Sequence, residues 1–288
     1  MSNRTGQLHV VATPIGNLGD ISARACEILA SVDHIAAEDT RHSRQLLQRL
    51  GIKGALVSLH EHNETERIER VLGWLDAGES VALISDAGTP LISDPGYRLV
   101  RALHAAGYPV LAVPGPSSVI AALSIAGLPT DRFFYEGFLP PRAGPRRRRL
   151  EALASAGHTL VFLEAGRRVL ATLEVMVDVF GGERESAVCR ELTKRFETTR
   201  TDSLSNLLEW VQADSDQVRG EFVLVVGPPP QAPSPEAVSI PAAEELVRML
   251  RREGLGARST ARVVARLTGE STNNLYRQAT EEDRDTKE

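Results

Sequence analysis

Short apolar runs alternate with amphipathic stretches along the first 115 residues of the chain. The runs are rich in β-branched residues and have the length of buried strands, whereas the stretches between them repeat apolar residues at helical spacing. The predicted strands are Leu8–Ala12, His34–Ala37, Ala55–Leu59, Val81–Ser85 and Val110–Val113, and the predicted helices are Ile21–Ser31, Ser43–Leu50, Glu64–Asp76 and Gly96–Ala106. This alternation predicts an N-terminal α/β domain over residues 1–115, built on a mostly parallel sheet.

The alternation continues over residues 116–228 and predicts a second α/β domain. Its predicted helices are Ser117–Ala126, Arg146–Ser155, Arg167–Phe180 and Leu204–Gln212, and its predicted strands are Phe133–Phe138, Thr159–Leu163, Ser186–Arg190 and Glu221–Val226. Residues 229–240 are rich in proline and are expected to form a semi-rigid linker. Residues 241–288 are expected to form a small helical tail with a helix-turn-helix-like arrangement.

Three loops rich in glycine and proline follow predicted strands of the first domain. They are Thr13–Asn17, Ser85–Gly96 and Pro114–Ser118. Because parallel sheets bind ligands at the carboxyl ends of their strands, we expect these loops to line a cleft. None carries the lysine of a phosphate-binding P-loop or a dinucleotide fingerprint. The loops therefore suit a ligand that is recognised by shape and hydrogen bonds.

Composition and charge narrow the class of protein. The chain has 288 residues, a net charge of −5 and two cysteines, and it contains neither an N-terminal apolar signal core nor an apolar run long enough to span a membrane. We therefore expect a cytoplasmic protein without membrane contact. Cys26 and Cys189 are expected to be buried thiols, and no metal site is expected.

Local basic patches stand out against the negative total charge. Arg142 and Arg146–Arg149 lie beside Pro140, Pro141 and Pro145, which favours a protruding loop. Clustered arginines most often contact phosphates, so this segment is a candidate for RNA binding, although a solvated face has the same pattern. The tail carries further scattered arginines.

Two polar segments follow the second and third predicted strands. Glu38, Asp39 and Arg41 form either a polar site or a helix cap with a surface ion pair. His60 lies in a polar loop, and its imidazole is a possible proton acceptor. The residues alone leave these alternatives open.

Several motifs follow one another in order along the chain: Val11–Ile21, Ala37–Arg41, Ser85–Gly96, Pro114–Ser118, Gly127–Pro129, Phe138–Pro140 and Arg190–Lys194. Together they closely resemble the ribosomal RNA small subunit methyltransferase I family, the RNA-modifying branch of the tetrapyrrole methylase superfamily. The resemblance covers nearly the whole chain. It implies a tetrapyrrole-methylase-like fold of two α/β domains with the cofactor in the cleft between them, and a homodimer.

The resemblance also implies an activity and its residues. Family members use S-adenosylmethionine to methylate the ribose 2′-hydroxyl of a cytidine in the decoding region of 16S rRNA in the small ribosomal subunit. Carried over by motif, the cofactor-binding residues are Pro14, Asp86, Ala87, Gly88, Thr89, Ser117, Ser118, Leu163 and Ala187. One departure is Arg167, which stands where members commonly have histidine, so no catalytic role is assigned to that position.

The expected reaction needs a base for a weakly acidic hydroxyl. The candidates are Glu38, Asp39 and His60, and the expected RNA contacts are Arg41, Arg142, Arg146, Arg147, Arg148 and Arg149. Two alternatives remain open: a small-molecule methyltransferase that acts on a tetrapyrrole precursor, and a nucleic-acid-binding protein without enzymatic activity. The arginine segment and tail argue against the first, and the three strand-end loops argue against the second.

Overall fold

The computed structural model describes residues 6–59, 64–214, 216–229 and 242–285. By its internal contacts the chain divides into two compact units, Met1–Pro230 and Gln231–Glu288. The first unit contains two five-stranded sheets, and the second contains helices in its described part. Among the described residues, no helix is both long and apolar enough to cross a membrane.

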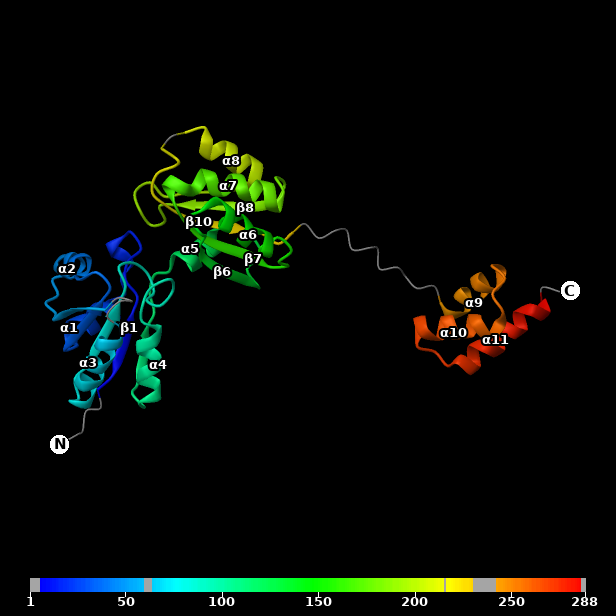
Figure 1. The fold of residues 1–288 in the computed structure, drawn as a ribbon, viewed down its shortest axis with the longest axis horizontal. Coiled ribbons are helices and arrows are strands. Elements are labelled where there is room, and N and C mark those ends of the chain that lie inside the picture. Colours follow the sequence, from blue (N-terminus) through cyan, green and yellow to red (C-terminus); the bar gives the residue numbers. More distant parts are fainter. Residues whose placement is uncertain (1–5, 60–63, 215, 230–241, 286–288) are drawn as a thin grey trace. The chain divides into compact units, whose positions relative to one another are not determined.

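The first sheet is parallel throughout and has the strand order β3-β2-β4-β1-β5. It lies in the part of the ribbon that is coloured from blue to green in Figure 1, where β1 is labelled. Its strands are β1 (Leu8–Val11), β2 (His34–Ala37), β3 (Leu56–Ser58), β4 (Val81–Ile84) and β5 (Val110–Val113). The central strand β4 is buried along its whole length because helices cover both faces of the sheet. Helices α3 (Glu64–Asp76) and α4 (Tyr97–Ala105) pack on one face, and α1 (Ala23–Ser31) and α2 (Thr40–Arg49) pack on the other.

The second sheet is mixed and has the order β6-β7-β10-β8-β9. Only β6 and β7 pair in parallel, and the other neighbours are antiparallel. Its strands are β6 (Phe133–Phe138), β7 (Thr159–Ala165), β8 (Glu185–Arg190), β9 (Thr198–Ser203) and β10 (Glu221–Val226). Helices α6 (Ala143–Leu153), α7 (Gly166–Phe180) and α8 (Leu204–Gln212) cover one face, and α5 (Ser118–Ile125) packs against the other.

The expected two-sheet α/β architecture is confirmed, with one strand that the sequence pattern missed, β9. The boundary placed between residues 115 and 116 stays a prediction. The proline-rich linker lies almost entirely outside the described residues.

The tail unit contains three helices, α9 (Ala243–Arg252), α10 (Ala257–Thr268) and α11 (Thr272–Asp285), in its described part. They enclose a small apolar core of Val247, Ala261, Val264, Leu275 and Ala279. Gly269 ends α10 in the left-handed conformation with φ of 77°, which reverses the chain before α11 begins.

Candidate functional site

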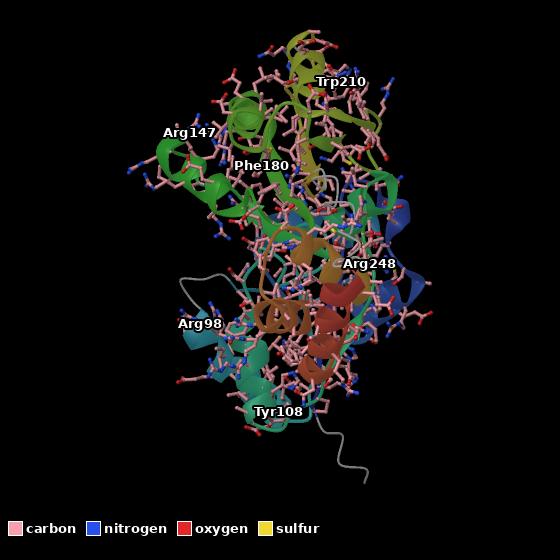
Figure 2. The ribbon with its side chains drawn as sticks, turned by 90° about the vertical axis from the view of Figure 1, so that its right-hand side faces the viewer. Arg98, Tyr108, Arg147, Phe180, Trp210 and Arg248 are labelled. Carbon is pink, nitrogen blue, oxygen red and sulfur yellow. The ribbon has the colours of Figure 1, made fainter. Side chains whose placement is uncertain are left out.

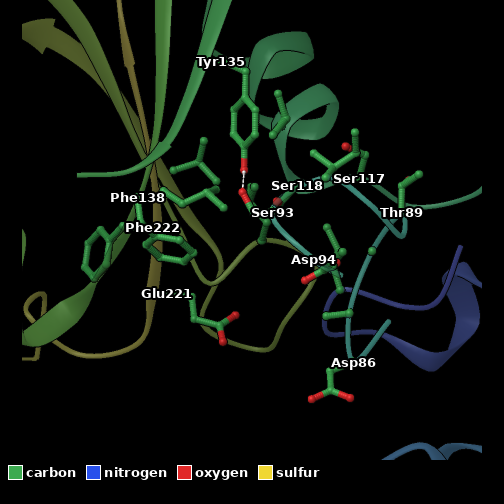
Figure 3. Close-up of a pocket in the computed structure, with 18 of the residues that line it drawn as sticks. Asp86, Thr89, Ser93, Asp94, Ser117, Ser118, Tyr135, Phe138, Glu221 and Phe222 are labelled. Carbon is green, nitrogen blue, oxygen red and sulfur yellow. Dashed lines mark hydrogen bonds between the residues drawn. The ribbon is translucent and has the colours of Figure 1, made fainter. Parts of the chain in front are cut away.

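A cavity of about 440 Å³ lies between the two sheets of the first unit (Figure 3). Loops that follow β1, β4 and β5 form one side, and the ends of β6, β7 and β10 form the other. The lining residues are Ile15, Glu38, Asp86, Ala87, Gly88, Thr89, Ile92, Ser93, Asp94, Ser117, Ser118, Val119, Tyr135, Phe138, Leu163, Glu164, Ala165, Leu192, Glu221, Phe222 and Val223. We refer to it as the first cavity.

Backbone hydrogen bonds tie the loops of the first sheet to one another. The Thr13 amide donates to the Gly88 carbonyl at 2.9 Å, and the Gly88 amide donates back to Thr13 at 3.1 Å. Gly88 has a φ of +80°, a conformation that favours glycine. The Thr89 hydroxyl donates to the Pro116 carbonyl at 3.1 Å. The three strand-end loops therefore act as one wall rather than three separate segments.

A polar contact joins the opposite side of the cavity to this wall. The Tyr135 hydroxyl from β6 lies 2.6 Å from the Ser93 hydroxyl in the loop after β4, and Figure 3 shows the two side chains pointing at each other. Because these residues come from different sheets, the contact holds the two sides of the cavity together.

Two loops beside the cavity hold residues in strained backbone conformations. Leu91 and Ser93 have φ of 72° and 70°, and Glu191 and Thr193 have φ of 51° and 65°. These four are the non-glycine residues with positive φ in the described part of the chain. Such conformations cost on the order of 1–3 kcal/mol each and cluster where function requires a fixed geometry.

The first cavity is acidic. Among its described lining residues there are five carboxylates and no lysine, arginine or histidine: Glu38, Asp86, Asp94, Glu164 and Glu221. Burial raises the pKa of Asp94, a hydrogen bond from Ser85 opposes the rise, and the charge of Asp86 adds to it. A positively charged ligand would relieve this crowding of negative charge.

Glu164 is a buried carboxylate that contacts Arg168, Thr172 and the amide of Ala165. Its side chain is 1% exposed and lies 3.0 Å from the Arg168 guanidinium. The Thr172 hydroxyl donates to it at 2.7 Å, and the Ala165 amide donates to it at 2.9 Å. This network fixes the junction of β7 and α7, so Glu164 shapes the wall and its charge is already compensated.

A second cavity of about 320 Å³ adjoins the first and differs from it in charge. It is lined by Pro14, Ile15, Gly16, Leu18, His42, Gln45, Leu46, Arg49, Asp86, Ala87, Lys194 and Glu221. Four of these residues also line the first cavity: Ile15, Asp86, Ala87 and Glu221. Both cavities therefore meet at the loops that follow β1 and β4.

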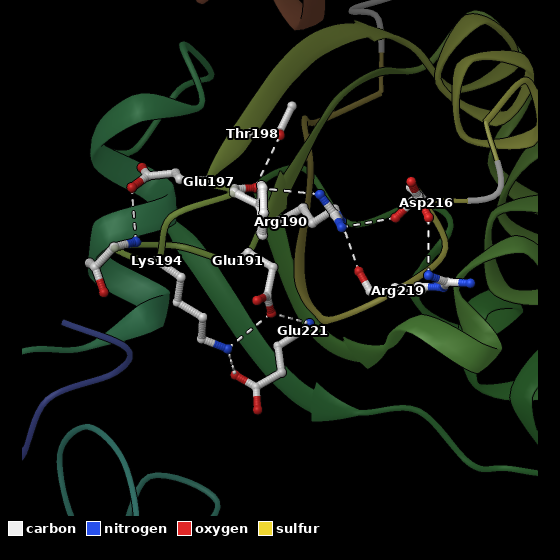
Figure 4. Close-up of polar contacts among 10 residues, drawn as sticks. Arg190, Glu191, Lys194, Glu197, Thr198, Asp216, Arg219 and Glu221 are labelled. Carbon is white, nitrogen blue, oxygen red and sulfur yellow. Dashed lines mark hydrogen bonds and ion pairs between the residues drawn. The ribbon is translucent and has the colours of Figure 1, made fainter.

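Lys194 connects the second cavity to a network of polar contacts in the loop after β8 (Figure 4). Its ammonium donates to Glu191 and to Glu221, each at 2.9 Å. In the same region Arg190 donates to the carbonyls of Arg219 and Asp216 at 2.7 and 2.8 Å. These contacts hold the loop that carries Lys194 against the start of β10.

The structure gathers most of the cofactor residues predicted from the sequence at the first cavity. Those that line it are Asp86, Ala87, Gly88, Thr89, Ser117, Ser118 and Leu163. Pro14 lines the second cavity instead. Ala187 lies in β8, is 1% exposed and lines neither cavity. Their binding roles remain predictions.

The candidate bases fall in different environments. Glu38 is half-buried and lines the first cavity. Asp39 lines neither cavity; it caps α2, and hydrogen bonds from Arg41 lower the pKa of its carboxyl to about 2. Its amide donates to Asp86 at 3.2 Å, which joins the start of α2 to the loop after β4. His60 lies outside the described residues.

The expectation of a protruding arginine loop is wrong: Arg146–Arg149 lie in helix α6, which the sequence pattern predicted from Arg146 onward, and Arg142 is the N-cap residue of that helix. Pro145 lies in the first turn, where a helix needs no proline N–H. Arg146 is only 6% exposed, Arg147 pairs with Asp178 at 2.7 Å and lies at the surface in Figure 2, and Arg149 pairs with Glu136 at 2.6 Å. Arg142 and Arg148 are exposed, so the prediction of RNA contact now applies best to these two.

Several residues of the two cavities were not predicted as site residues. Asp94 and Ser93 lie within the Ser85–Gly96 loop, so the motif itself could have indicated them. Glu221 begins β10, which runs antiparallel to β7, so it reaches the site from the start of a strand. The residues of α2 that line the second cavity are His42, Gln45, Leu46 and Arg49, and no sequence motif distinguished them.

Comparisons with known proteins assign this architecture to a family. A sequence model described as tetrapyrrole (corrin/porphyrin) methylases matches residues 7–208, which shows that the chain belongs to this class of methyltransferases. Cobalt precorrin-4 methyltransferase, a cobalamin biosynthetic enzyme, shares the fold with a TM-score of 0.58 at 17% identity, over 79% of this chain and 96% of its own. Diphthine synthase matches with a TM-score of 0.58 at 17% identity, over 77% and 90%.

Curated relatives identify the branch of this family to which the chain belongs. The Pseudomonas aeruginosa protein named ribosomal RNA small subunit methyltransferase I is 52% identical over 95% of this chain and 96% of its own length. The protein of that name from Escherichia coli O157:H7 is 45% identical over 97% and 96%. Within the tetrapyrrole methylases, the chain therefore belongs to the ribosomal RNA small subunit methyltransferase I family.

Proposed function

We propose that this protein transfers a methyl group from S-adenosylmethionine to the ribose 2′-hydroxyl of a cytidine in the decoding region of 16S rRNA. The chain matches curated relatives over nearly their whole length, and these relatives are named as small-subunit rRNA methyltransferases. This match supports rRNA as the substrate. The protein would act in the cytoplasm, on the small ribosomal subunit.

The charge of the first cavity is the observation that carries the choice of cofactor. S-adenosylmethionine bears a sulfonium, an ammonium and a carboxylate group, has a net charge of about +1 and has no phosphate. A wall that contains Asp86 and Asp94 and, among its described residues, no basic side chain suits such a cation. The same wall disfavours nucleotide cofactors, whose phosphates would meet carboxylates at close range.

The proposed chemistry needs alignment and one proton acceptor. When bound, S-adenosylmethionine supplies an electrophilic methyl group. The linked loops after β1, β4 and β5 hold a fixed surface for it, and alignment of two reactants contributes on the order of 7–11 kcal/mol at best. A positioned base adds typically about 10²–10⁴-fold. Glu38 suits this role better than Asp39, because a carboxyl with a pKa of about 2 holds a proton weakly.

A large RNA substrate requires contacts beyond the cavities. Arg41 is exposed at 85% of its side chain, and Arg142 and Arg148 are exposed on α6. We assign these three residues, with the arginines of the tail unit, to phosphate contacts.

We propose that the protein forms a homodimer. Helix α5 is apolar at every position except Ser118 and Ser124, and so apolar a helix is normally buried. In the single chain it leaves Ile120 and Ile125 exposed at 56% and 45%, and Leu111 on the edge strand β5 and Phe133 on the edge strand β6 are exposed at 42% and 43%. A second copy of the chain would cover this surface.

The decisive experiment maps 2′-O-methylation on small-subunit rRNA from cells with and without the gene, followed by rescue with the purified protein. Loss and recovery of one methylated cytidine is the expected result. Because the solved structures that share the fold include a methyltransferase of cobalamin biosynthesis, the assay also offers uroporphyrinogen as an acceptor. Methylation of uroporphyrinogen but not of rRNA would overturn the proposal.

A further inference from the structure

Helix α2 presents one face to the second cavity. His42, Gln45, Leu46 and Arg49 line that cavity and are spaced i, i+3, i+4 and i+7, which places them along one stripe of the helix. The opposite stripe of α2 is anchored in the first sheet, where Leu47 is 3% exposed. The polar stripe is therefore held in a fixed position rather than displayed on a mobile segment.

The second cavity combines the groups that a nucleotide requires. Arg49 is exposed and forms no ion pair with any described residue, so its guanidinium is available to a phosphate. Gln45 supplies both an amide donor and an acceptor for the edge of a base. Leu18 and Leu46 supply an apolar surface for the face of a base.

Lys194 adds a second cation on the other side of the cavity. Its ammonium is shared between Glu191 and Glu221, so it contributes less free charge than Arg49. The two cavities thus differ sharply: the first has no basic lining residue in the described part of the chain, and the second has Arg49 and Lys194. This division suits a cationic methyl donor in one and an anionic acceptor in the other.

The position of the shared wall fixes where the two ligands would meet. Asp86, Ala87, Ile15 and Glu221 line both cavities, so a group that passes from one to the other crosses these residues. Asp86 accepts a hydrogen bond from the amide of Asp39, the capping residue of α2. The loop of the first cavity and the helix of the second are therefore held in a fixed relation.

We propose that the second cavity binds the acceptor nucleotide of the RNA, with Arg49 on a phosphate, Gln45 on the base edge and the ribose hydroxyl directed toward Asp86. The inference rests on the proposed methylation of rRNA and specifies its acceptor site. A single nucleotide held in this way must leave its stack, as is usual where proteins read or modify a base in structured RNA.

Two variants with matched controls on the same helix test the proposal. Arg49→Ala and Gln45→Ala are compared with Arg44→Ala and Gln48→Ala, whose native side chains are exposed and line neither cavity. Binding of a short RNA that contains the target cytidine is measured by fluorescence anisotropy over a range of salt concentrations. Binding of cytidine 5′-monophosphate and of S-adenosylmethionine is measured by calorimetry, and methylation is measured on small subunits.

Arg49→Ala should weaken RNA binding about tenfold and reduce its salt slope by about one, the behaviour of a lost phosphate contact. Gln45→Ala should weaken binding of cytidine 5′-monophosphate by a similar factor of about ten, the lower end of a base contact. All four variants should bind S-adenosylmethionine like the wild type, and the two controls should also bind RNA like the wild type.

Equal RNA binding by Arg49→Ala and Arg44→Ala, with equal mononucleotide binding by Gln45→Ala and Gln48→Ala, would overturn the inference. A wild-type protein that binds the nucleotide but does not methylate rRNA would instead overturn the proposed function. The binding arm needs no turnover, so the two failures are distinguishable.

Discussion

Replacing Asp94 by asparagine should weaken binding of the methyl donor and, at the same time, leave the ligand-free protein at least as stable as the wild type. Asp94 is half-buried on the wall of the first cavity, and burial raises the pKa of its carboxyl. A folded-state pKa above the unfolded value of about 3.9 means that ionisation opposes folding. Stability is therefore lost as pH rises from about 4 through the raised pKa of Asp94.

The expected loss of affinity follows from the type of contact. A hydrogen bond to a charged group contributes about 1.5–3 kcal/mol, which corresponds to about 10–150-fold in affinity. Because Asp94 is partly open to solvent, its interactions are screened, and the lower end applies. Asp94→Asn should therefore bind S-adenosylmethionine about tenfold more weakly at neutral pH.

Calorimetry with S-adenosylmethionine and with S-adenosylhomocysteine, which lacks the sulfonium charge, measures the effect. A larger loss for the first ligand places Asp94 near sulfur, whereas equal losses place it near the ammonium group. Asp33→Asn is the matched control: the Asp33 carboxylate accepts hydrogen bonds from Ser80 at 2.7 and 2.8 Å and lines neither cavity. This control should lower the melting temperature and leave affinity unchanged. Wild-type affinity in Asp94→Asn would refute the reasoning.

Three further predictions concern buried and capping groups. Glu164→Gln should lower the free energy of unfolding, measured with urea, by about 3 kcal/mol, because it leaves the largely buried Arg168 guanidinium without its charged partner. A loss below about 1 kcal/mol would contradict a stabilising role of this ion pair. Cys189 is buried as expected, whereas Cys26 is partly exposed, contrary to expectation. Iodoacetamide near neutral pH should therefore label Cys26 and spare Cys189, which is 0% exposed and whose thiol pKa is raised to about 11 by burial, until the protein is unfolded; equal rates by mass spectrometry would contradict this. Asp39→Asn should leave the single-turnover methylation rate close to that of the wild type, since the carboxyl of Asp39 has a pKa of about 2. A rate about 10²-fold lower in the folded variant would instead identify Asp39 as the base.

The sequence predicted the strands of both sheets wherever a strand is apolar. Strands β2, β5, β6 and β10 have the predicted bounds, because their apolar residues contrast with polar turns on either side. Strand β9 was missed because its sequence from Thr198 to Ser203 is polar throughout. It lies at the edge of its sheet with β8 as its neighbour, so no buried face imposes an apolar pattern.

The arginine segment shows a different limit. Gly144 and Pro145 are turn-forming residues in most contexts, so the predicted helix began at Arg146, whereas α6 begins at Ala143 and holds Pro145 in its first turn. The ion pairs of Arg147 with Asp178 and of Arg149 with Glu136 depend on residues far away in sequence. Charge clustering alone could not distinguish such paired arginines from ones that are available to RNA.

From the pattern of residues, the site could be predicted only on the side made by the strand-end loops of adjacent strands; on the other side, the family resemblance indicated Leu163. Parallel strands end at one edge, so the loops after β1, β4 and β5 were expected to converge, and they do. The opposite wall depends on pairings that no local pattern encodes, such as the antiparallel start of β10 at Glu221 and the contact of Tyr135 with Ser93. The opposite charges of the two cavities emerge only when both walls are assembled.

The missing side chain at position 16 lets two loops from different sheets approach closely. A Cβ on Gly16 would lie 2.4 Å from Cγ of Lys194 and 3.0 Å from the Thr193 hydroxyl, so a larger residue would displace the Lys194 side chain or part the loop after β1 from the loop after β8. These loops carry Ile15 and Leu192, which line the first cavity. A single hydrogen atom therefore sets how closely the loops can pack, and a methyl group in its place would disturb the ammonium that Glu191 and Glu221 share.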